Sequence, residues 1–180
     1  CALPIWEKGL ASTLRVGDAL KNPGQEFPFE ADAMVPEMEV LGDPVRFEEI
    51  TVSGTVVGTG ATVGVKAEIR AKVESLCARC REKVFRPIVA ELDAEFAREP
   101  DSEDPDLYTF EGTTLDLSQA IGDALVLALP FRFLCKEDCK GLCPKCGANL
   151  NKGSCSCPKD EDDSNPFAAL RLIVDHNEEV

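Results

Sequence analysis

The sequence has little histidine, few aromatic side chains other than phenylalanine, and no long apolar run. Its 180 residues include one histidine, His176, one tyrosine and one tryptophan. A single histidine excludes a histidine-rich metal centre and argues against a Ser-His-Asp triad. The longest apolar run, residues 124–129, is far shorter than the about 20 residues that cross a bilayer. We therefore expect no membrane-spanning helix.

The usual signatures of catalysis are also missing. There is no P-loop and no G-x-G-x-x-G, and the many acidic residues are better interpreted as a solubilising surface than as an acid–base pair. Cys77-Ala-Arg-Cys80 has the spacing of a redox dithiol. Such dithiols work at a helix N-terminus that lowers one thiol pKa, whereas this pair follows a long strand pattern. We expect a protein that is not an enzyme.

Cysteine, in contrast, is abundant and clustered. Six of the nine cysteines fall in residues 135–157 with the spacing C-x3-C-x3-C-x2-C-x8-C-x-C, and Cys77 and Cys80 form a further C-x2-C. Thiolate pairs at this spacing, near turn-forming proline and glycine, are typical of structural zinc. The alternative is a disulfide framework, but no secretion signal is visible, and we expect a reducing, cytoplasmic setting. We give Cys1 no role.

With Cys1 set aside, eight cysteines can form two structural zinc sites of four cysteines each. One set can close locally because few residues separate its members, and the other joins the upstream pair to the segment after a predicted helix. Both would have four protein ligands and no open position, which is typical of structural zinc. The predicted ligands are Cys143, Cys146, Cys155 and Cys157 in the local site, and Cys77, Cys80, Cys135 and Cys139 in the other.

The net charge of −14 argues against nucleic acid as a partner, but its distribution weakens that argument. Residues 77–86 and 131–159 hold ten of the nineteen basic residues and only three acids. Two zinc ions with eight thiolates would subtract four charges, which leaves this part mildly positive. These cations either offset thiolate charge or contact RNA phosphates. The candidate RNA-binding residues are Arg79, Arg81, Lys83, Arg132, Lys136, Lys140 and Lys145.

Hydrophobic alternation predicts a sheet. Apolar residues recur at every second position of 63–73 and of 88–96, on either side of Cys77 and Cys80, which indicates an antiparallel hairpin closed by zinc. The adjacent acids Glu48 and Glu49 interrupt the apolar alternation of residues 45–52, which predicts a β-bulge. Residues 27–35 are expected to form an extended segment near a sheet edge. We expect helices over residues 14–22 and 117–128, and Thr114 or Asp116 can cap the second helix. We expect a loop over residues 99–113.

The predicted fold class is α+β, with a curved antiparallel sheet of about four to six strands, one packed helix and a Cys-rich zinc-binding pole. The predicted domains are an α+β body over residues 1–134 and a zinc ribbon over 135–157. Residues 158–180 are expected to form an acidic linker and a short helix that begins near Asn165-Pro166 and could dock through Phe167, Leu170 and Val174.

The order of four motifs resembles the YceD family, the large ribosomal RNA subunit accumulation proteins. The motifs are the Cys77–Cys80 pair with Leu76, the helix from 115 to 130, the cysteine segment 134–151, and Asn165-Pro-Phe-Ala-Ala-Leu170. The resemblance covers most of residues 12–174. It implies a bacterial cytoplasmic factor that supports 23S ribosomal RNA accumulation or processing during large-subunit assembly. The sequence departs from the family pattern in the high acidity of its body, which argues against an RNA-binding surface that extends over the whole protein.

Two functional hypotheses remain open. In the first, the protein is a non-enzymatic assembly factor that binds precursor 23S RNA or an assembling large subunit through a basic pole presented by zinc. In the second, the zinc ribbon is an adaptor that docks on a ribosomal protein or on a nuclease without touching RNA. The salt dependence of binding separates the two hypotheses, because phosphate contacts release counterions.

Overall fold

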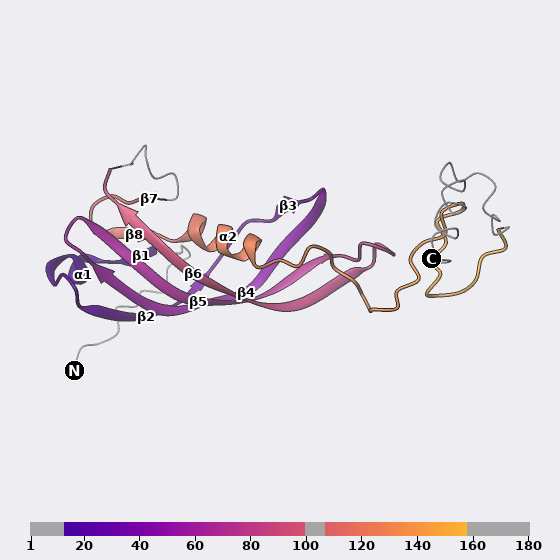
Figure 1. Ribbon diagram of the computed structural model, residues 1–180, viewed down its shortest axis with the longest axis horizontal. Coiled ribbons are helices and arrows are strands. Elements are labelled where there is room, and N and C mark those ends of the chain that lie inside the picture. Colours follow the sequence, from indigo (N-terminus) through magenta and orange to yellow (C-terminus); the bar gives the residue numbers. More distant parts are fainter. Residues whose placement is uncertain (1–12, 100–106, 158–180) are drawn as a thin grey trace, which may run out of the picture. The chain divides into compact units, whose positions relative to one another are not determined.

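The protein is described by a computed structural model, which places residues 13–99 and 107–157 (Figure 1). The chain divides into two compact units between Cys139 and Lys140. The predicted acidic linker and terminal helix lie outside the described residues, as does Cys1.

The first unit is built on an open sheet with the strand order β2-β4-β5-β6-β7, in which β3 pairs with β4 beside β2. All pairs are antiparallel except β6 with β7, which is parallel. The expected sheet of four to six strands is therefore present among the described residues. Its strands are β2 (Glu26–Ala33), β3 (Met38–Val40), β4 (Asp43–Gly58), β5 (Thr62–Leu76), β6 (Lys83–Ala97) and β7 (Tyr108–Thr109).

The β5–β6 hairpin is the longest ladder of the sheet. It is paired without interruption from Thr62 opposite Ala97 to Leu76 opposite Lys83. Alternate residues of both strands are buried, with Val65, Ile69 and Val73 almost fully so, because successive side chains point to opposite faces. This face packs against helix α2 (Ser118–Leu127). The predicted hairpin and its inward face are confirmed.

A bulge interrupts β4 at the predicted acidic pair. The register between β4 and β5 shifts between Glu48 and Thr51, and Glu49 adopts a φ of 53°. The extra residue lets Phe47 and Ile50, which are three positions apart, both be buried. At the other side of β4, strand β2 forms a sheet edge and exposes Glu26, Glu30 and other polar residues, which discourage edge-to-edge pairing.

A second, two-stranded sheet pairs β1 (Thr13–Arg15) with β8 (Thr114–Asp116), and helix α1 (Gly17–Lys21) follows β1. The helix expected over 14–22 is therefore shorter, because its first residues pair as a strand. Thr114 does not cap α2, since it lies in β8, whereas the Asp116 carboxylate accepts a hydrogen bond from the Ser118 N–H at 2.8 Å. Of the loop expected over 99–113, residues 100–106 lie outside the described residues, and the described remainder contains strand β7.

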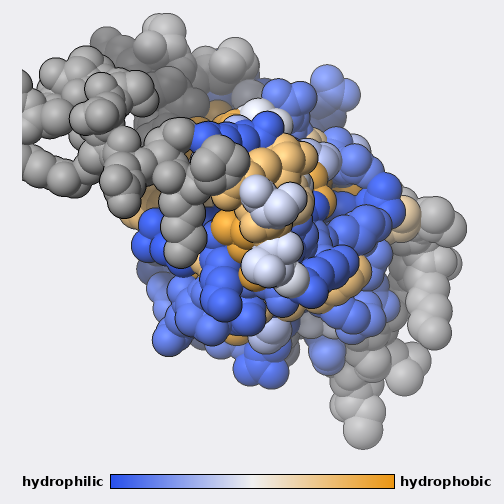
Figure 2. Space-filling model, turned by 90° about the vertical axis from the view of Figure 1, so that its right-hand side faces the viewer, coloured by the Kyte–Doolittle hydropathy of each residue, from blue (hydrophilic) through white to orange (hydrophobic). Residues whose placement is uncertain are grey.

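Helix α2 is held by its apolar side. Ile121 and Leu125 are essentially inaccessible, and Leu117 just before the helix is buried with them. Full burial of such a side chain contributes roughly 1.5–3 kcal/mol, and a ten-residue helix is marginal without it. Outside the core the surface is charged: in the face drawn in Figure 2, hydrophilic side chains predominate around a small group of apolar ones.

Gly54 of β4 lies where its neighbouring strand approaches most closely. A Cβ at this position would lie 2.1 Å from the Lys66 carbonyl oxygen and 2.5 Å from Ala67, whereas one at Gly64 would meet nothing closer than 3.9 Å. We expect Gly54→Ala to lower the free energy of unfolding by about 2 kcal/mol or more through overpacking. Gly64→Ala, the matched control in the facing strand, should change it by less than about 1 kcal/mol. Urea unfolding measures both, and equal effects would contradict the close approach.

Candidate metal centres

Four cysteines gather where the β5–β6 hairpin ends, and we call them cluster 1. Cys77 follows β5 and Cys80 lies in the turn before β6, while Cys135 and Cys139 come from the segment after α2. The Cys77 and Cys139 sulfur atoms are 3.8 Å apart and those of Cys80 and Cys135 3.6 Å, with all four within 4.8 Å of one another. A tetrahedral zinc site with Zn–S bonds of about 2.3 Å has sulfur atoms about 3.8 Å apart. The spacing of cluster 1 fits such an ion.

The second unit contains cluster 2, formed by Cys143, Cys146, Cys155 and Cys157. Their sulfur atoms also lie within 4.8 Å of one another. The eight cysteines are thus grouped in the two fours expected from their spacing, and none of these eight is joined in a disulfide. In the part of the chain that the structure describes, no other group of three or more Cys, His, Asp or Glu side chains has this spacing.

The two C-x2-C turns have the same backbone hydrogen bonds. The Cys77 carbonyl oxygen accepts the Arg81 N–H at 2.9 Å, and the Cys143 carbonyl oxygen accepts the Gly147 N–H at 2.8 Å. Each first cysteine also donates its own N–H to the carbonyl oxygen five residues on, at 2.8 Å in both turns. The same turn therefore presents two thiols to one point in both clusters.

The fifth position of each turn requires a left-handed backbone. Gly147 occupies it in cluster 2 with a φ of 73°, and Arg81 occupies it in cluster 1 with a φ of 61°. Glycine adopts this conformation freely, whereas other residues lose roughly 1–2 kcal/mol. Arg81 forms an ion pair with Asp43 at the start of β4, which offsets part of that cost.

The first cysteine of each turn has a lowered thiol pKa. Burial raises the pKa of Cys77, but backbone N–H groups, first that of Cys135 and then that of Cys80, outweigh it and bring the pKa to about 6. In cluster 2 the Cys146 N–H leads a similar set that brings the pKa of Cys143 to about 6. The turns thus favour a thiolate, the form that binds metal.

Later cysteines of each cluster behave in the opposite way, with a raised thiol pKa. Burial raises the pKa of Cys135 to about 12, and a hydrogen bond with the Cys146 thiol raises the pKa of Cys157 to about 12. Four close thiols cannot all ionise without a compensating cation, because each thiolate disfavours the next. A divalent ion at the centre reverses that preference and deprotonates its ligands. The donor set of each cluster therefore suits a resident zinc ion with no open position.

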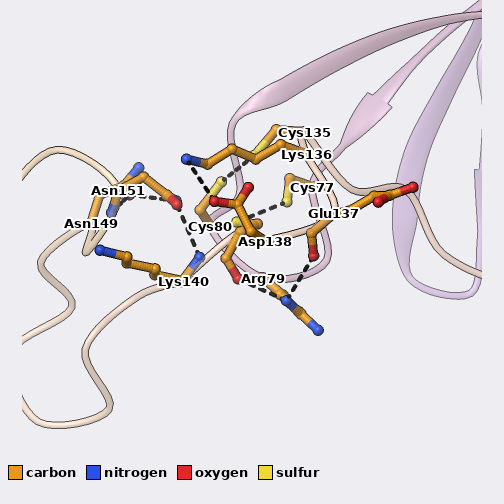
Figure 3. Close-up of polar contacts among 11 residues, drawn as sticks. Cys77, Arg79, Cys80, Cys135, Lys136, Glu137, Asp138, Lys140, Asn149 and Asn151 are labelled. Atoms are coloured by element: carbon orange, nitrogen blue, oxygen red, sulfur yellow. Dashed lines mark hydrogen bonds and ion pairs between the residues drawn. The ribbon is translucent and has the colours of Figure 1, made fainter.

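Arg79 bridges the two segments that make cluster 1 (Figure 3). Its Nη1 donates to the Cys139 carbonyl oxygen at 2.8 Å and to that of Glu137 at 3.4 Å. The Ala78 N–H next to it donates to the Phe133 carbonyl oxygen at 2.8 Å. The turn between β5 and β6 thus binds the chain on both sides of Cys135 through the backbone, independently of sulfur. Sequence reasoning missed this role, because nothing in the spacing links Arg79 to residues so far along the chain.

Other predicted RNA-binding cations of the first unit also have internal partners. Lys83 Nζ lies 2.5 Å from Glu74 Oε1, and that hydrogen bond lowers the pKa of Glu74. Lys136 Nζ lies 3.7 Å from Asp138 Oδ2. Arg132 is exposed beyond the end of α2.

The remaining two candidates, Lys140 and Lys145, belong to the second unit. The described part of that unit, residues 140–157, contains three lysines and no acid. Its backbone is ordered by asparagine: the Lys140 N–H donates to Asn151 Oδ1 at 2.9 Å, and the Asn151 N–H to Asn149 Oδ1 at 2.9 Å. The structure thus separates the seven candidates into five on the first unit and two on the second.

Comparison with known proteins identifies the family. Residues 65–173 match the family model described as large ribosomal RNA subunit accumulation protein YceD. The chain belongs to the YceD family. The matched range includes all eight clustered cysteines as well as β6 and α2. No solved structure matches the chain.

Related YceD-like sequences come from mycobacteria and plants. An uncharacterized protein of Mycobacterium leprae is 35% identical over 155 residues, which cover 83% of this chain and 61% of the relative. One from Mycobacterium tuberculosis is 37% identical over 114 residues, 59% of this chain and 49% of the relative. The chloroplastic YCED homolog 1 of Arabidopsis thaliana, named a large ribosomal RNA subunit accumulation protein, is 40% identical over 80 residues, 43% and 25% of the two chains. The chain spans about half the length of the mycobacterial relatives.

The name of the family describes a role in the accumulation of large-subunit ribosomal RNA. Among the described residues, no helix is long and apolar enough to cross a membrane.

Arg79→Ala should open cluster 1 without unfolding the sheet. The variant loses a charge-assisted hydrogen bond to the Cys139 carbonyl, and the segment carrying that cysteine should leave the turn more readily. We expect alkylation of Cys139 by iodoacetamide to become about tenfold faster, as measured by peptide mass spectrometry on the reduced protein. Arg81→Ala, which removes a cation from the same turn but contacts Asp43, is the control. Parent-like protection of Cys139 in the Arg79 variant would show that the hydrogen bond is dispensable.

Proposed function

We propose that this protein is a non-enzymatic cytoplasmic factor that supports 23S ribosomal RNA accumulation or processing and the assembly of the large ribosomal subunit. Membership of the YceD family is the observation that supports the proposal most directly. The described residues agree with a binding role, because their only clusters with metal-ligand spacing consist of four thiols each. Thiolate zinc sites without an open position stabilise structure and do not activate water.

In this proposal each cluster holds one zinc ion. Cys77, Cys80, Cys135 and Cys139 bind the ion of cluster 1, and Cys143, Cys146, Cys155 and Cys157 that of cluster 2. Sulfur distances near those of a tetrahedral site and lowered pKa values at Cys77 and Cys143 support zinc over disulfides. The ion of cluster 1 would join the hairpin to the segment after α2, and that of cluster 2 would fold the second unit.

The proposal divides the chain into three domains. Residues 1–134 form the body, 135–157 the zinc ribbon, and 158–180 a linker with a terminal helix. Cys135 and Cys139 then belong to the ribbon by sequence, while their thiols gather with Cys77 and Cys80 of the body.

RNA contact in this proposal is strongest at the second unit. Lys140 and Lys145 lie in a segment without acids, so its charge remains net positive even after a zinc site of four thiolates subtracts two. Arg79, Arg81, Lys83 and Lys136 already interact within the first unit, and they would reach phosphate only in addition to those partners.

The second candidate function is a zinc-ribbon adaptor that docks on a ribosomal protein or a nuclease. It is favoured by the internal pairing of those four cations and by the net charge of −14, both of which disfavour extensive phosphate contact. An acidic protein without RNA contacts could still join an assembling particle through a basic ribosomal protein.

Zinc content and stability test the metal assignment. We expect about two zinc ions per chain by elemental analysis under reducing conditions, and about one in Cys80→Ser and in Cys155→Ser. Because cluster 1 closes the longest hairpin, Cys80→Ser should lower the thermal midpoint of the sheet by about 10 °C, and Cys155→Ser by less than about 2 °C. Well under one zinc per chain in the parent would refute the zinc sites, and equal midpoints in the two variants would refute their division.

Association with RNA tests the function. The parent should bind a 23S RNA fragment with salt-dependent affinity. Lys140→Ala combined with Lys145→Ala should weaken binding and flatten the plot of log K against log salt by about 0.7–0.9 for each phosphate interaction removed. The control is Lys66→Ala, which removes an exposed lysine that pairs with Asp93 on the body. If the parent binds purified ribosomal proteins but no 23S fragment at any salt concentration, the adaptor function replaces RNA binding.

A further inference from the structure

The sheet surface opposite the core carries a hollow of about 370 Å³ beside the β4 bulge. Its volume lies in the range of about 300–1,000 Å³ common for small-ligand sites. In the β5–β6 ladder, Lys72 faces Pro87 and Arg70 faces Val89, so these side chains share the face that points away from the buried residues. Three cations and one acid are among the residues that line the hollow, which include Glu49, Arg70, Lys72, Phe85, Arg86 and Pro87.

An exposed aromatic ring forms one wall of this hollow. Phe85 keeps 50% of its surface accessible, and the Lys72 ammonium lies 5.7 Å from the centre of its ring. Phe85 is not part of the core cluster, and the exposed half of its surface is accessible to a ligand. An aromatic face beside a flexible cation is the combination on which proteins stack single-stranded bases.

The cations that line the hollow differ in how firmly they are held, and Lys72 is the least engaged of them. In the part of the chain that the structure describes, Lys72 has no ion pair within 4 Å and contacts the Phe85 ring. Arg70 binds Glu68 through Nε at 2.6 Å, which leaves its two terminal nitrogens available. Arg86 faces the buried Val73 in the ladder and donates to the Leu134 carbonyl oxygen at 3.0 Å, so its guanidinium is directed to the core side of the sheet and not into the hollow.

Glu49 is the one acidic residue among those that line the hollow. Glu49 belongs to the β4 bulge, which gives it a φ of 53°, and it is exposed beside the cations of the neighbouring strand. A carboxylate beside a stacked base can accept a hydrogen bond from an exocyclic amino group or from a ribose 2′-hydroxyl. Glu48, opposite Lys72, and Glu68 surround the cations and would limit the site to a short stretch of RNA.

We propose that this hollow holds one unpaired nucleotide of ribosomal RNA, stacked on Phe85, with Lys72 and Arg70 at its phosphates and Glu49 as hydrogen-bond acceptor. The inference rests on the proposed RNA-binding function and adds to it a single-stranded reading site on the body. It also explains how a strongly acidic body can take part in RNA binding without being coated by RNA.

The test uses the full chain and a fluorescein-labelled single-stranded oligoribonucleotide of about ten nucleotides, with its hairpin duplex and its DNA counterpart as comparison probes. Phe85→Leu keeps an apolar side chain but removes the ring, and it should weaken single-strand binding about 5- to 100-fold with an unchanged salt slope. Lys72→Gln should flatten that slope by about 0.7. Glu49→Gln should reduce the preference for RNA over DNA.

Matched controls exist on the same two strands. Val89→Ala removes an apolar side chain that is 57% exposed on β6, and Lys66→Gln removes an exposed lysine on β5, both outside the hollow. Both should bind the oligoribonucleotide as the parent does, and every variant should keep the urea midpoint of the parent.

The outcomes distinguish this inference from the proposed function. If the parent binds the single strand and the Phe85 and Lys72 variants bind equally well, the hollow is not the site and the proposed function stands. If the parent binds no oligoribonucleotide but sediments with large-subunit precursors, the hollow is overturned as an RNA site and the role in assembly remains. Loss of binding to a ribosomal protein in the Phe85 variant, with RNA binding unchanged, would assign the hollow to a protein partner.

Discussion

In the first unit, one convergence of sulfur atoms joins the end of the β5–β6 hairpin to the segment after α2. Cys77 and Cys139 are 62 positions apart in the chain, and Cys80 and Cys135 are 55 positions apart, yet their thiols meet at the end of a single hairpin. Bringing such distant segments together costs chain entropy that grows with the logarithm of the loop length, and a shared ion would hold them together as a crosslink does. The Arg79 and Ala78 hydrogen bonds to the same segment provide the geometry on which the sulfur atoms converge.

That convergence also explains how a short helix is kept on a long sheet. Helix α2 packs through Ile121 and Leu125, but it has no basic residue in its last turn, and its N-cap position is occupied by Leu117, whose side chain cannot cap. Its C-terminal end is continued by Phe133, which is buried, and then by Cys135. The helix is therefore anchored along its length by apolar burial and beyond its end by cluster 1. Either anchor alone would leave one end free to fray.

The sequence predicts best those features that repeat at short range. Alternation in β5 and β6, the bulge at Glu48 and Glu49, and the close spacing of the cysteines of cluster 2 each express a local rule, and the structure agrees with them. Features that depend on distant partners could not be predicted in this way. Strand β8 forms only because β1, near the other end of the described chain, pairs with it.

The partners of the basic residues show the same limitation. A count of cations near the cysteines treats them as equivalent, whereas Asp43 and Glu74 reach Arg81 and Lys83 only after the sheet has formed. The count also omits Arg70 and Lys72, because in the sequence they alternate with apolar residues on a strand that also carries glutamates. The contact of Lys72 with Phe85 depends on the pairing of β5 with β6.

The two C-x2-C turns, finally, show how one local structure can serve two purposes. Gly147 gives cluster 2 an unstrained turn, and all four of its cysteines lie close together in the sequence, so this cluster can close without help from the sheet. Arg81 makes the corresponding turn of cluster 1 less favourable by itself, but its side chain reaches Asp43 of β4 and ties the turn to the sheet. An Arg81→Gly substitution would remove the strain of the left-handed backbone, but it would also remove the ion pair with Asp43. The residue at this one position of the turn therefore differs between a cluster that is tied to the sheet through Asp43 and a cluster whose ligands all lie close together in the sequence.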